Sequence, residues 1–182
     1  MTAPEIRFQQ FLDYAKSRSA TPARDVMIVS IARQRLWHFE DGVLRRTRTV
    51  STSLRPPSCI ENSLGTPTGL HEVCERIGDG VAVGGVFKAR VHDGRIYVDC
   101  PEHDEGRHLI TTRILRLRGL EPGHNAGGDC DTYKRFVYIH GTNREDTLGH
   151  PASHGCVLLA NTEMLDLFEA IPVGSQLWIT LD

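Results

Sequence analysis

The sequence has no long apolar run and no excess of charge of either sign. None of its stretches approaches the ~18 consecutive apolar residues that a membrane-spanning helix requires. Its 182 residues carry 21 Lys and Arg against 23 Asp and Glu, which gives a formal net charge of -2. So balanced a chain has no long-range field to attract nucleic acid or an anionic membrane. We therefore predict no membrane span and no nucleic-acid partner.

The N-terminal sequence also lacks the pattern of a secretory leader. Residues 1–19 contain no run of ~7–15 apolar residues and no small-residue cleavage site. Instead, the basic residues Arg7 and Lys16 are interleaved with the acidic residues Glu5 and Asp13. We therefore predict a cytoplasmic protein. The alternative is a periplasmic protein whose signal sequence was removed.

Cysteine is scarce and irregularly spaced. The five cysteines are Cys59, Cys74, Cys100, Cys130 and Cys156. A chain of this size builds a core without disulfides, so we expect reduced thiols. Structural zinc sites need two close ligand pairs, and the sequence has one, Cys100 with His103. No second close pair exists among His108, His124 and Cys130, so we predict no metal and no other cofactor.

The residues that are present form a strand-rich pattern with two helices. At 40% hydrophobic residues the chain can bury one core and is short for two domains. Apolar periodicity predicts helices over 5–17 and 161–170. Strand-like runs cover 25–32, 35–40, 43–50, 81–92, 95–100, 109–120, 136–140 and 176–181. We predict an N-terminal helix and linker over 1–22, and one mainly β domain over 23–182 with a helix after its last cysteine.

Local signals refine several of these strands. Asp41-Gly42 and Asp93-Gly94 each predict a two-residue hairpin turn between neighbouring strands. The strand over 109–120 alternates leucine with Arg116 and Arg118, which is typical of a half-exposed strand. The strand over 136–140 is short and apolar, and we expect it to end at His140.

Ser153-His154-Gly155-Cys156 is the most informative motif, with His140-Gly141-Thr142 upstream of it. A cysteine thiol has a pKa of about 8.5, and its thiolate is the reactive form. A nearby imidazole can take the proton, so the motif predicts a cysteine nucleophile. The alternative is that Cys156 is a buried structural thiol, as most free cysteines are.

The residue types suggest separate roles within this motif. We predict that His140 is the base for Cys156 and that a backbone carbonyl such as that of Gly141 orients its ring. The amides of Gly155 and Cys156 would be free to bind an oxyanion, because glycine permits the necessary close approach. His154 would shape the oxyanion pocket, and Ser153 would hold the turn. Asn161 has two roles open to it, as a cap of the following helix or as a brace for the cysteine loop.

These motifs resemble the catalytic signature of the L,D-transpeptidases, the YkuD-type domain. The resemblance is carried by three segments: Ile139 to Asn143, Gly149 to Val157, and Asn161. The turn Gly65-Thr66-Pro67-Thr68-Gly69 and the run Val50 to Ser53 are similar to upstream parts of that family. The resemblance implies a β-sandwich-like catalytic domain that acts on peptidoglycan stem peptides or muropeptides.

The resemblance also implies a reaction. Cys156 would attack the carbonyl of the third stem residue, a diamino acid such as meso-diaminopimelate, and the terminal D-alanine would leave. An amine of a second stem or water would then resolve the thioester. Family members are also acylated by carbapenems, so carbapenem acylation is expected here.

Several residues are candidates for binding the substrate. Arg113 could hold its carboxylate, as could Arg116 or Arg118, although an exposed strand face explains these arginines equally well. Tyr138, Thr142 and Asn143 adjoin His140 in sequence and are further candidates. The resemblance fails at Leu158, where many family members carry arginine, and only arginine offers a bidentate fork to a carboxylate.

Three functions remain open at this stage. A chain without a leader favours an L,D-carboxypeptidase that trims D-alanine from recycled tetrapeptides in the cytoplasm. A periplasmic L,D-transpeptidase that forms 3-3 crosslinks or exchanges D-amino acids is the second possibility. The third is a domain that binds wall peptides without catalysis.

Overall fold

The structure is a computed structural model that describes residues 2–182. Its strands are β1 (Asp25–Ser30), β2 (Arg35–Glu40), β3 (Val43–Thr49), β4 (Gly69–Ile77), β5 (Gly85–Lys88), β6 (Val91–Ile96), β7 (Ile110–Gly119), β8 (Tyr138–Thr142), β9 (Val157–Leu159) and β10 (Gln176–Thr180). Its α-helices are α1 (Ala3–Ser17), α2 (Pro101–Asp104) and α3 (Asn161–Ala170). The prediction of a mainly β fold, with one helix at the front and one after Cys156, is confirmed.

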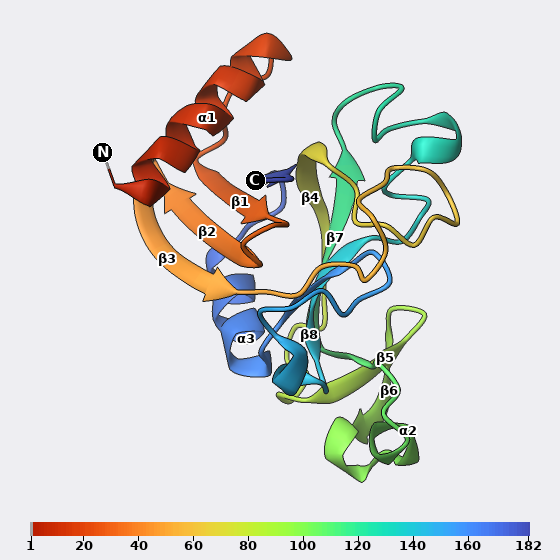
Figure 1. Ribbon diagram of the computed structural model, residues 1–182. Helices are drawn as coiled ribbons and strands as arrows, with labels where there is room; N and C mark the ends of the chain where they lie inside the picture. Colours follow the sequence, from red (N-terminus) through yellow and green to blue (C-terminus); the bar gives the residue numbers. More distant parts are fainter. Residues whose placement is uncertain (1) are drawn as a thin grey trace.

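All the strands belong to one curled sheet (Figure 1). Its order is β3-β2-β1-β10-β4-β7-β5-β6, and β8 pairs with β7 and with β9. The pairs β1–β10 and β8–β9 are parallel. The second parallel pair matters for function, because it lays the segment that begins after Cys156 alongside the strand that contains His140.

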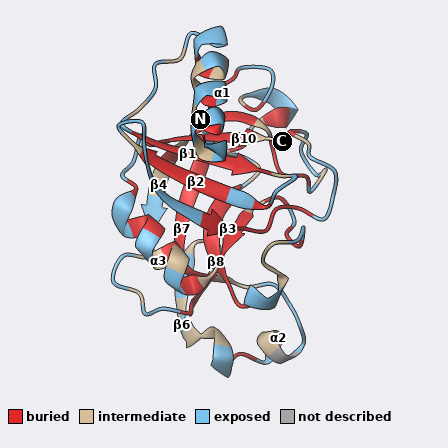
Figure 2. Cartoon of the chain, turned by 60° about the vertical axis from the view of Figure 1, so that its left-hand side comes forward, coloured by how far each residue is buried: buried red, intermediate tan, exposed pale blue. Residues whose placement is uncertain are grey.

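Strand β1 explains why both faces of the sheet are covered. Its side chains alternate between two cores, as the two-residue period of a strand requires. Val26 and Ile28 pack under α1, whereas Met27 and Val29 pack in a core that includes side chains of α3. The second core also holds residues of β7 and β8, so the curled sheet encloses it as a sandwich would. Figure 2 shows these central strands as buried.

The first predicted hairpin is confirmed and the second is wrong. Asp41-Gly42 joins β2 to β3, but the turn between β5 and β6 lies at Ala89-Arg90, where φ is 46° and 70°. Asp93-Gly94 instead lies inside β6, where an Asp93 carboxylate oxygen accepts the backbone N–H of Arg95 at 3.1 Å. The pair therefore lies at an irregularity in the β5–β6 register and not at a turn. Phe87, buried against Ile114, favours this register of the hairpin.

Strands β7 and β8 also differ from the predictions. β8 begins two residues later than expected, so His140 lies in its middle and not at its end. Phe136 cannot extend the strand, because its φ is 56° and its side chain is 49% exposed. β7 is mostly buried and not half-exposed, since Arg116 is buried in a pair with Glu75 at 3.0 Å.

Three elements were not predicted: β4, β9 and α2. β4 carries charged residues among its apolar ones, and β9 has only three residues, so neither gives a clear periodic signal. Within residues 2–182, no helix combines the length and apolar character that crossing a bilayer requires.

Candidate active site

The β8–β9 pairing brings the predicted cysteine and histidine to one place. His140 lies opposite Leu158 in the parallel ladder, and Cys156 stands immediately before β9. The backbone N–H of Tyr138 donates to the Cys156 sulfur at 3.4 Å. Cys156 and His140 both line a cavity of about 180 Å³. The two side chains therefore face the same space, although no hydrogen bond joins them directly within residues 2–182.

The turn before Cys156 is held by Ser153, as predicted. Its hydroxyl donates to the Cys156 carbonyl oxygen at 2.6 Å and accepts the Gly155 N–H at 3.2 Å. Gly155 has a φ of 125°, which L-residues rarely adopt. The prediction that the Gly155 amide is free for an oxyanion is wrong, because Ser153 occupies it. The Cys156 amide has no acceptor among the described residues and is the remaining candidate.

His140 is held in one orientation by its own neighbour. Its Nδ1 lies 2.8 Å from the carbonyl oxygen of Gly141, which is the predicted acceptor. A carbonyl only accepts, so Nδ1 carries the proton and Nε2 is free to act as a base. Burial and the nearby His108 lower the pKa of His140 to about 4, against the opposing effect of the bond to the Gly141 carbonyl. The ring is therefore neutral near pH 7.

Cys156 is also neutral in the resting protein. Burial raises the pKa of its thiol to about 11, against the opposing effects of the Tyr138 amide and the Arg135 cation. A thiol whose pKa lies above neutrality does not transfer its proton spontaneously to an imidazole whose pKa lies below neutrality. The pair consequently rests as thiol and imidazole, and not as a thiolate–imidazolium ion pair.

His154 lies at the surface of the site, whereas Asn161 is buried. His154 is exposed, lines both cavities that meet at Cys156, and stands edge-on to His108 with ring centroids 5.9 Å apart. Asn161 is buried in the first turn of α3, where Ala160 occupies the cap position. The cap alternative is therefore wrong. Its amide nitrogen donates to the Thr142 carbonyl at 2.8 Å and to Glu145 at 2.7 Å, so Asn161 braces β8 and not the cysteine loop, for which a brace was predicted.

The predicted substrate-binding residues are not gathered at the thiol. Arg113 is buried, donates to the Val81 carbonyl and lies over the Phe168 ring, and it lines neither cavity at Cys156. Arg118 pairs with Glu72 on the exposed side of β7. The predicted role of these arginines in binding a carboxylate therefore has no support in the geometry.

The residues beside His140 contribute mainly through packing and backbone. The Tyr138 hydroxyl accepts from Arg90 at 3.2 Å, so Tyr138 offers Cys156 its amide and not its phenol. Thr142 does line the His140 cavity. Asn143 is buried and is bonded to the backbone of Arg107 and Leu109, at 2.9 and 2.8 Å. Asn143 therefore anchors the segment that covers the site.

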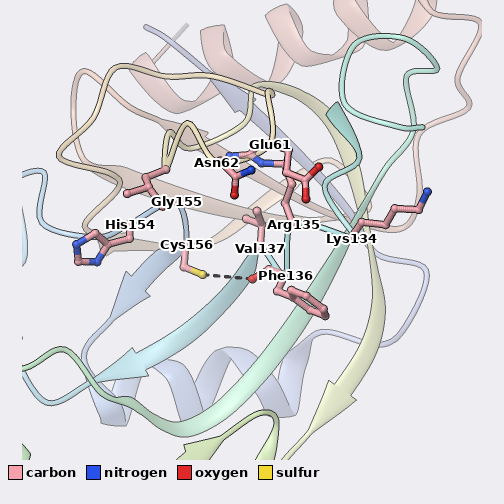
Figure 3. A pocket seen from close by; sticks show the side chains of 10 residues that line it. Glu61, Asn62, Lys134, Arg135, Phe136, Val137, His154, Gly155 and Cys156 are labelled. Atoms are coloured by element: carbon pink, nitrogen blue, oxygen red, sulfur yellow. Dashed lines mark hydrogen bonds between the residues drawn. The ribbon is translucent and has the colours of Figure 1, made fainter. Parts of the chain in front are cut away.

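Sequence reasoning missed a second cavity on the other side of the thiol. This cavity has a volume of about 280 Å³. Figure 3 shows the residues that line it. Its lining residues are Glu61, Asn62, Leu64, Lys134, Arg135, Phe136, Val137, His154, Gly155 and Cys156. Lys134-Arg135, a basic pair just before the His140 strand, was the available signal. The loop around Glu61 gave none, because it is distant in sequence from both halves of the motif.

The candidate metal ligands do not meet in the fold. His103 stacks against Tyr97, His124 lies 3.8 Å from the Cys59 sulfur, and the Cys130 sulfur faces the carbonyl of Gly127. No group of three or more His, Cys, Asp or Glu side chains in the described part of the chain could hold a metal ion. All five cysteines are free.

The protein is thus a mainly β domain whose curled sheet holds a cysteine–histidine pair where the parallel strands β8 and β9 meet. Comparison with family models identifies it further: the L,D-transpeptidase catalytic domain model, YkuD, matches residues 24–179. The chain belongs to this family.

Individual relatives share short, similar segments with the chain. YqjB of Bacillus subtilis, named as an L,D-transpeptidase, is 48% identical over 48 residues, which are 26% of this chain and 27% of that protein. YbiS of Escherichia coli K12, also named as one, is 48% identical over 42 residues, 23% of this chain and 14% of that protein. The matched segments thus span well under two thirds of these relatives.

Solved structures share the fold over most of the chain. An L,D-transpeptidase from Mycobacterium smegmatis matches with a TM-score of 0.54 at 18% identity, over 88% of this chain and 60% of that one. The L,D-transpeptidase LdtMt1, solved in complex with imipenem, matches with a TM-score of 0.52 at 18% identity, over 86% of this chain and 59% of that one. At this identity the likeness concerns the fold.

Proposed function

We propose that this protein is an L,D-carboxypeptidase that removes the terminal D-alanine from peptidoglycan stem tetrapeptides during muropeptide recycling. The observation that carries the proposal is the neutral, oriented His140 sharing one cavity with the Cys156 thiol. Membership of the L,D-transpeptidase family supports the substrate class.

In the proposed first step, the Cys156 sulfur attacks the carbonyl carbon of the third residue while Nε2 of His140 takes the thiol proton. A concerted transfer is required because the resting pair is neutral. The Cys156 amide stabilises the resulting oxyanion, an interaction that is typically worth ~3–4 kcal/mol in the transition state. The intermediate collapses, the carbon–nitrogen bond breaks, and His140 gives the proton to the departing amine of D-alanine.

In the second step, water takes the place of D-alanine. His140 takes a proton from the water as the water oxygen attacks the thioester carbonyl. The carbon–sulfur bond then breaks, and His140 returns the proton to the Cys156 sulfur. The leaving amine and the attacking water must both face His140, so both occupy the 180 Å³ cavity. That cavity is walled by Leu109, Ile110 and Leu158, and its small size favours water and a single small amino acid over an entire acceptor stem.

Product analysis tests the proposal directly. The purified protein is incubated with a disaccharide-tetrapeptide, and the products are measured by mass spectrometry. We expect disaccharide-tripeptide and free D-alanine, with neither produced by Cys156→Ala. Crosslinked dimers, or D-amino-acid exchange products in quantity, would refute hydrolysis as the main reaction.

A transpeptidase is the second candidate, and family membership is the observation that favours it. Both reactions pass through the same thioester, so carbapenem acylation of Cys156 is proposed in either case. The structure of LdtMt1 with imipenem supports this part of the proposal. If no acyl adduct forms on Cys156 with a carbapenem or a tetrapeptide, a domain that binds wall peptides without catalysis becomes the better reading. The cytoplasmic location stays a prediction, which fractionation of native cells would test.

A further inference from the structure

The larger cavity beside Cys156 presents charges of both signs. Its lining includes Glu61 from the loop before Gly65, and Lys134 and Arg135 from the segment before β8 (Figure 3). The His140 cavity differs, because its lining residues include no carboxylate, lysine or arginine. The two spaces that meet at the thiol therefore offer a substrate different chemistry.

Glu61 and Lys134 are available to a ligand. Both residues are exposed, and neither takes part in an ion pair within the described residues 2–182. Two opposite charges that line one cavity without pairing leave room for a group between them. A ligand group with a single charge would pair with only one of these two side chains, and an apolar group would pair with neither.

Arg135 has a structural role, because its guanidinium already donates hydrogen bonds within the protein. It donates to the carbonyl oxygens of Ser58 at 3.0 Å and Gly65 at 2.7 Å. The loop between them is tied a second time where the Glu61 N–H donates to the Asp129 carbonyl at 2.6 Å. These bonds fix the wall that carries Glu61 relative to the segment that carries Lys134, so the spacing of the two free charges is set before a ligand arrives.

The position of His140 decides which part of the substrate this cavity receives. The leaving amine must face His140, which lines only the smaller cavity. The acyl part, on the other side of the attacked carbonyl, is then left with the cavity of Glu61 and Lys134. The nearest substituent of the acyl part is the side chain of the third stem residue.

We infer that Glu61 and Lys134 select a third residue whose side chain ends in a carbon bearing both an ammonium and a carboxylate, as in meso-diaminopimelate. The Glu61 carboxylate accepts from the ammonium, and the Lys134 ammonium donates to the carboxylate. The inference rests on the proposed function, since it uses the acyl-transfer geometry to orient the substrate. A third residue that is lysine, or diaminopimelate whose side-chain carboxylate is amidated, keeps the ammonium. It lacks the carboxylate with which Lys134 would pair.

The test compares three tetrapeptides as substrates of the purified protein: one with meso-diaminopimelate, one with its amidated form and one with L-lysine. We expect kcat/KM to be at least about tenfold higher for the meso-diaminopimelate peptide, because the other two peptides lack one charge-assisted hydrogen bond. Lys134→Gln should remove this preference by lowering only the first rate, and Lys134→Glu should favour the lysine peptide. Glu61→Gln should lower all three rates. Lys16→Gln and Glu169→Gln, which alter exposed charges elsewhere, should change none of them.

The outcomes separate the two proposals. Equal rates for the three peptides, or a preference unaffected by Lys134→Gln, would overturn the inference while leaving the enzyme assignment intact. If amidation of the terminal D-alanine carboxylate lowers the rate of the unmodified protein but not that of Lys134→Gln, Lys134 binds the leaving group and the inference is also overturned. Absence of turnover with all three peptides in the unmodified protein would be a failure of the proposed function itself.

Discussion

Asn161 offers the sharpest test of how the site is held, because a cap and a brace predict different energies. Its side-chain oxygen accepts from the hydroxyls of Thr111 and Thr112, and its nitrogen donates to Thr142 and Glu145. Replacement by alanine removes all four bonds and leaves buried partners without a substitute. At a net ~1 kcal/mol for each bond, Asn161→Ala should lower the free energy of unfolding by about 4 kcal/mol.

Loss of a helix cap alone costs typically ~1 kcal/mol. For a chain of this length, 1 kcal/mol corresponds to ~2–4 °C in Tm. A brace therefore predicts a fall of about 8–16 °C, and a cap predicts about 2–4 °C. Asn161→Ser makes the distinction sharper, because serine is a good capping residue but is too short to reach both Thr142 and Glu145.

The measurement is urea and thermal unfolding of Asn161→Ala, Asn161→Ser and Thr162→Ala, the last being an exposed position in the same helical turn. We expect both Asn161 variants to lose several kcal/mol and Thr162→Ala to stay within about 0.5 kcal/mol of the parent protein. A serine variant as stable as the parent, or an alanine variant that loses ~1 kcal/mol or less, would refute the brace.

Three further outcomes follow from the same site. Burial keeps His140 neutral and holds its pKa at about 4, below the ordinary 6.5. The free energy of unfolding should therefore fall by about 3 kcal/mol as pH drops from 6.5 toward 4. Unfolding at pH 7 and pH 4.5 measures this fall, which His140→Asn should reduce and exposed His150→Gln should not. Alkylation of Cys156 should keep accelerating toward pH 11, and a plateau below pH 8 would contradict a neutral resting thiol. Gly141→Ala should cost ~1–3 kcal/mol in urea unfolding, because its Cβ would lie 2.7 Å from the Asn161 oxygen and 2.8 Å from the Thr111 carbonyl oxygen.

Local chemistry was the part of this protein that its sequence predicted well. The Asp41-Gly42 hairpin formed because both partner strands flank the turn directly. The Gly141 carbonyl orients His140 because the two are adjacent, and Ser153 holds its turn for the same reason. In each case the interaction spans three residues or fewer, so the residue types alone determine it.

Interactions between distant segments were not predictable in the same way. The role of Asn161 depends on β7 residues about fifty positions away, and nothing near Asn161 indicates them. The wall that carries Glu61 reaches Cys156 because Arg135 holds it across more than seventy residues. Asp93-Gly94 failed as a turn signal because burial of Phe87 favours a different register of that hairpin.

Leu158, where the resemblance to the family is weakest, helps to explain the neutral resting pair. Its buried side chain lies opposite His140 in the sheet and walls the cavity that the thiol and imidazole share. An apolar wall disfavours the charged form of both groups, which is the direction of both pKa shifts. An arginine here would add a cation beside the thiol and ease its ionisation. With leucine, the thiol gains its reactivity only when a carbonyl carbon arrives to receive the sulfur as His140 takes the proton. Activation is thereby tied to the presence of substrate.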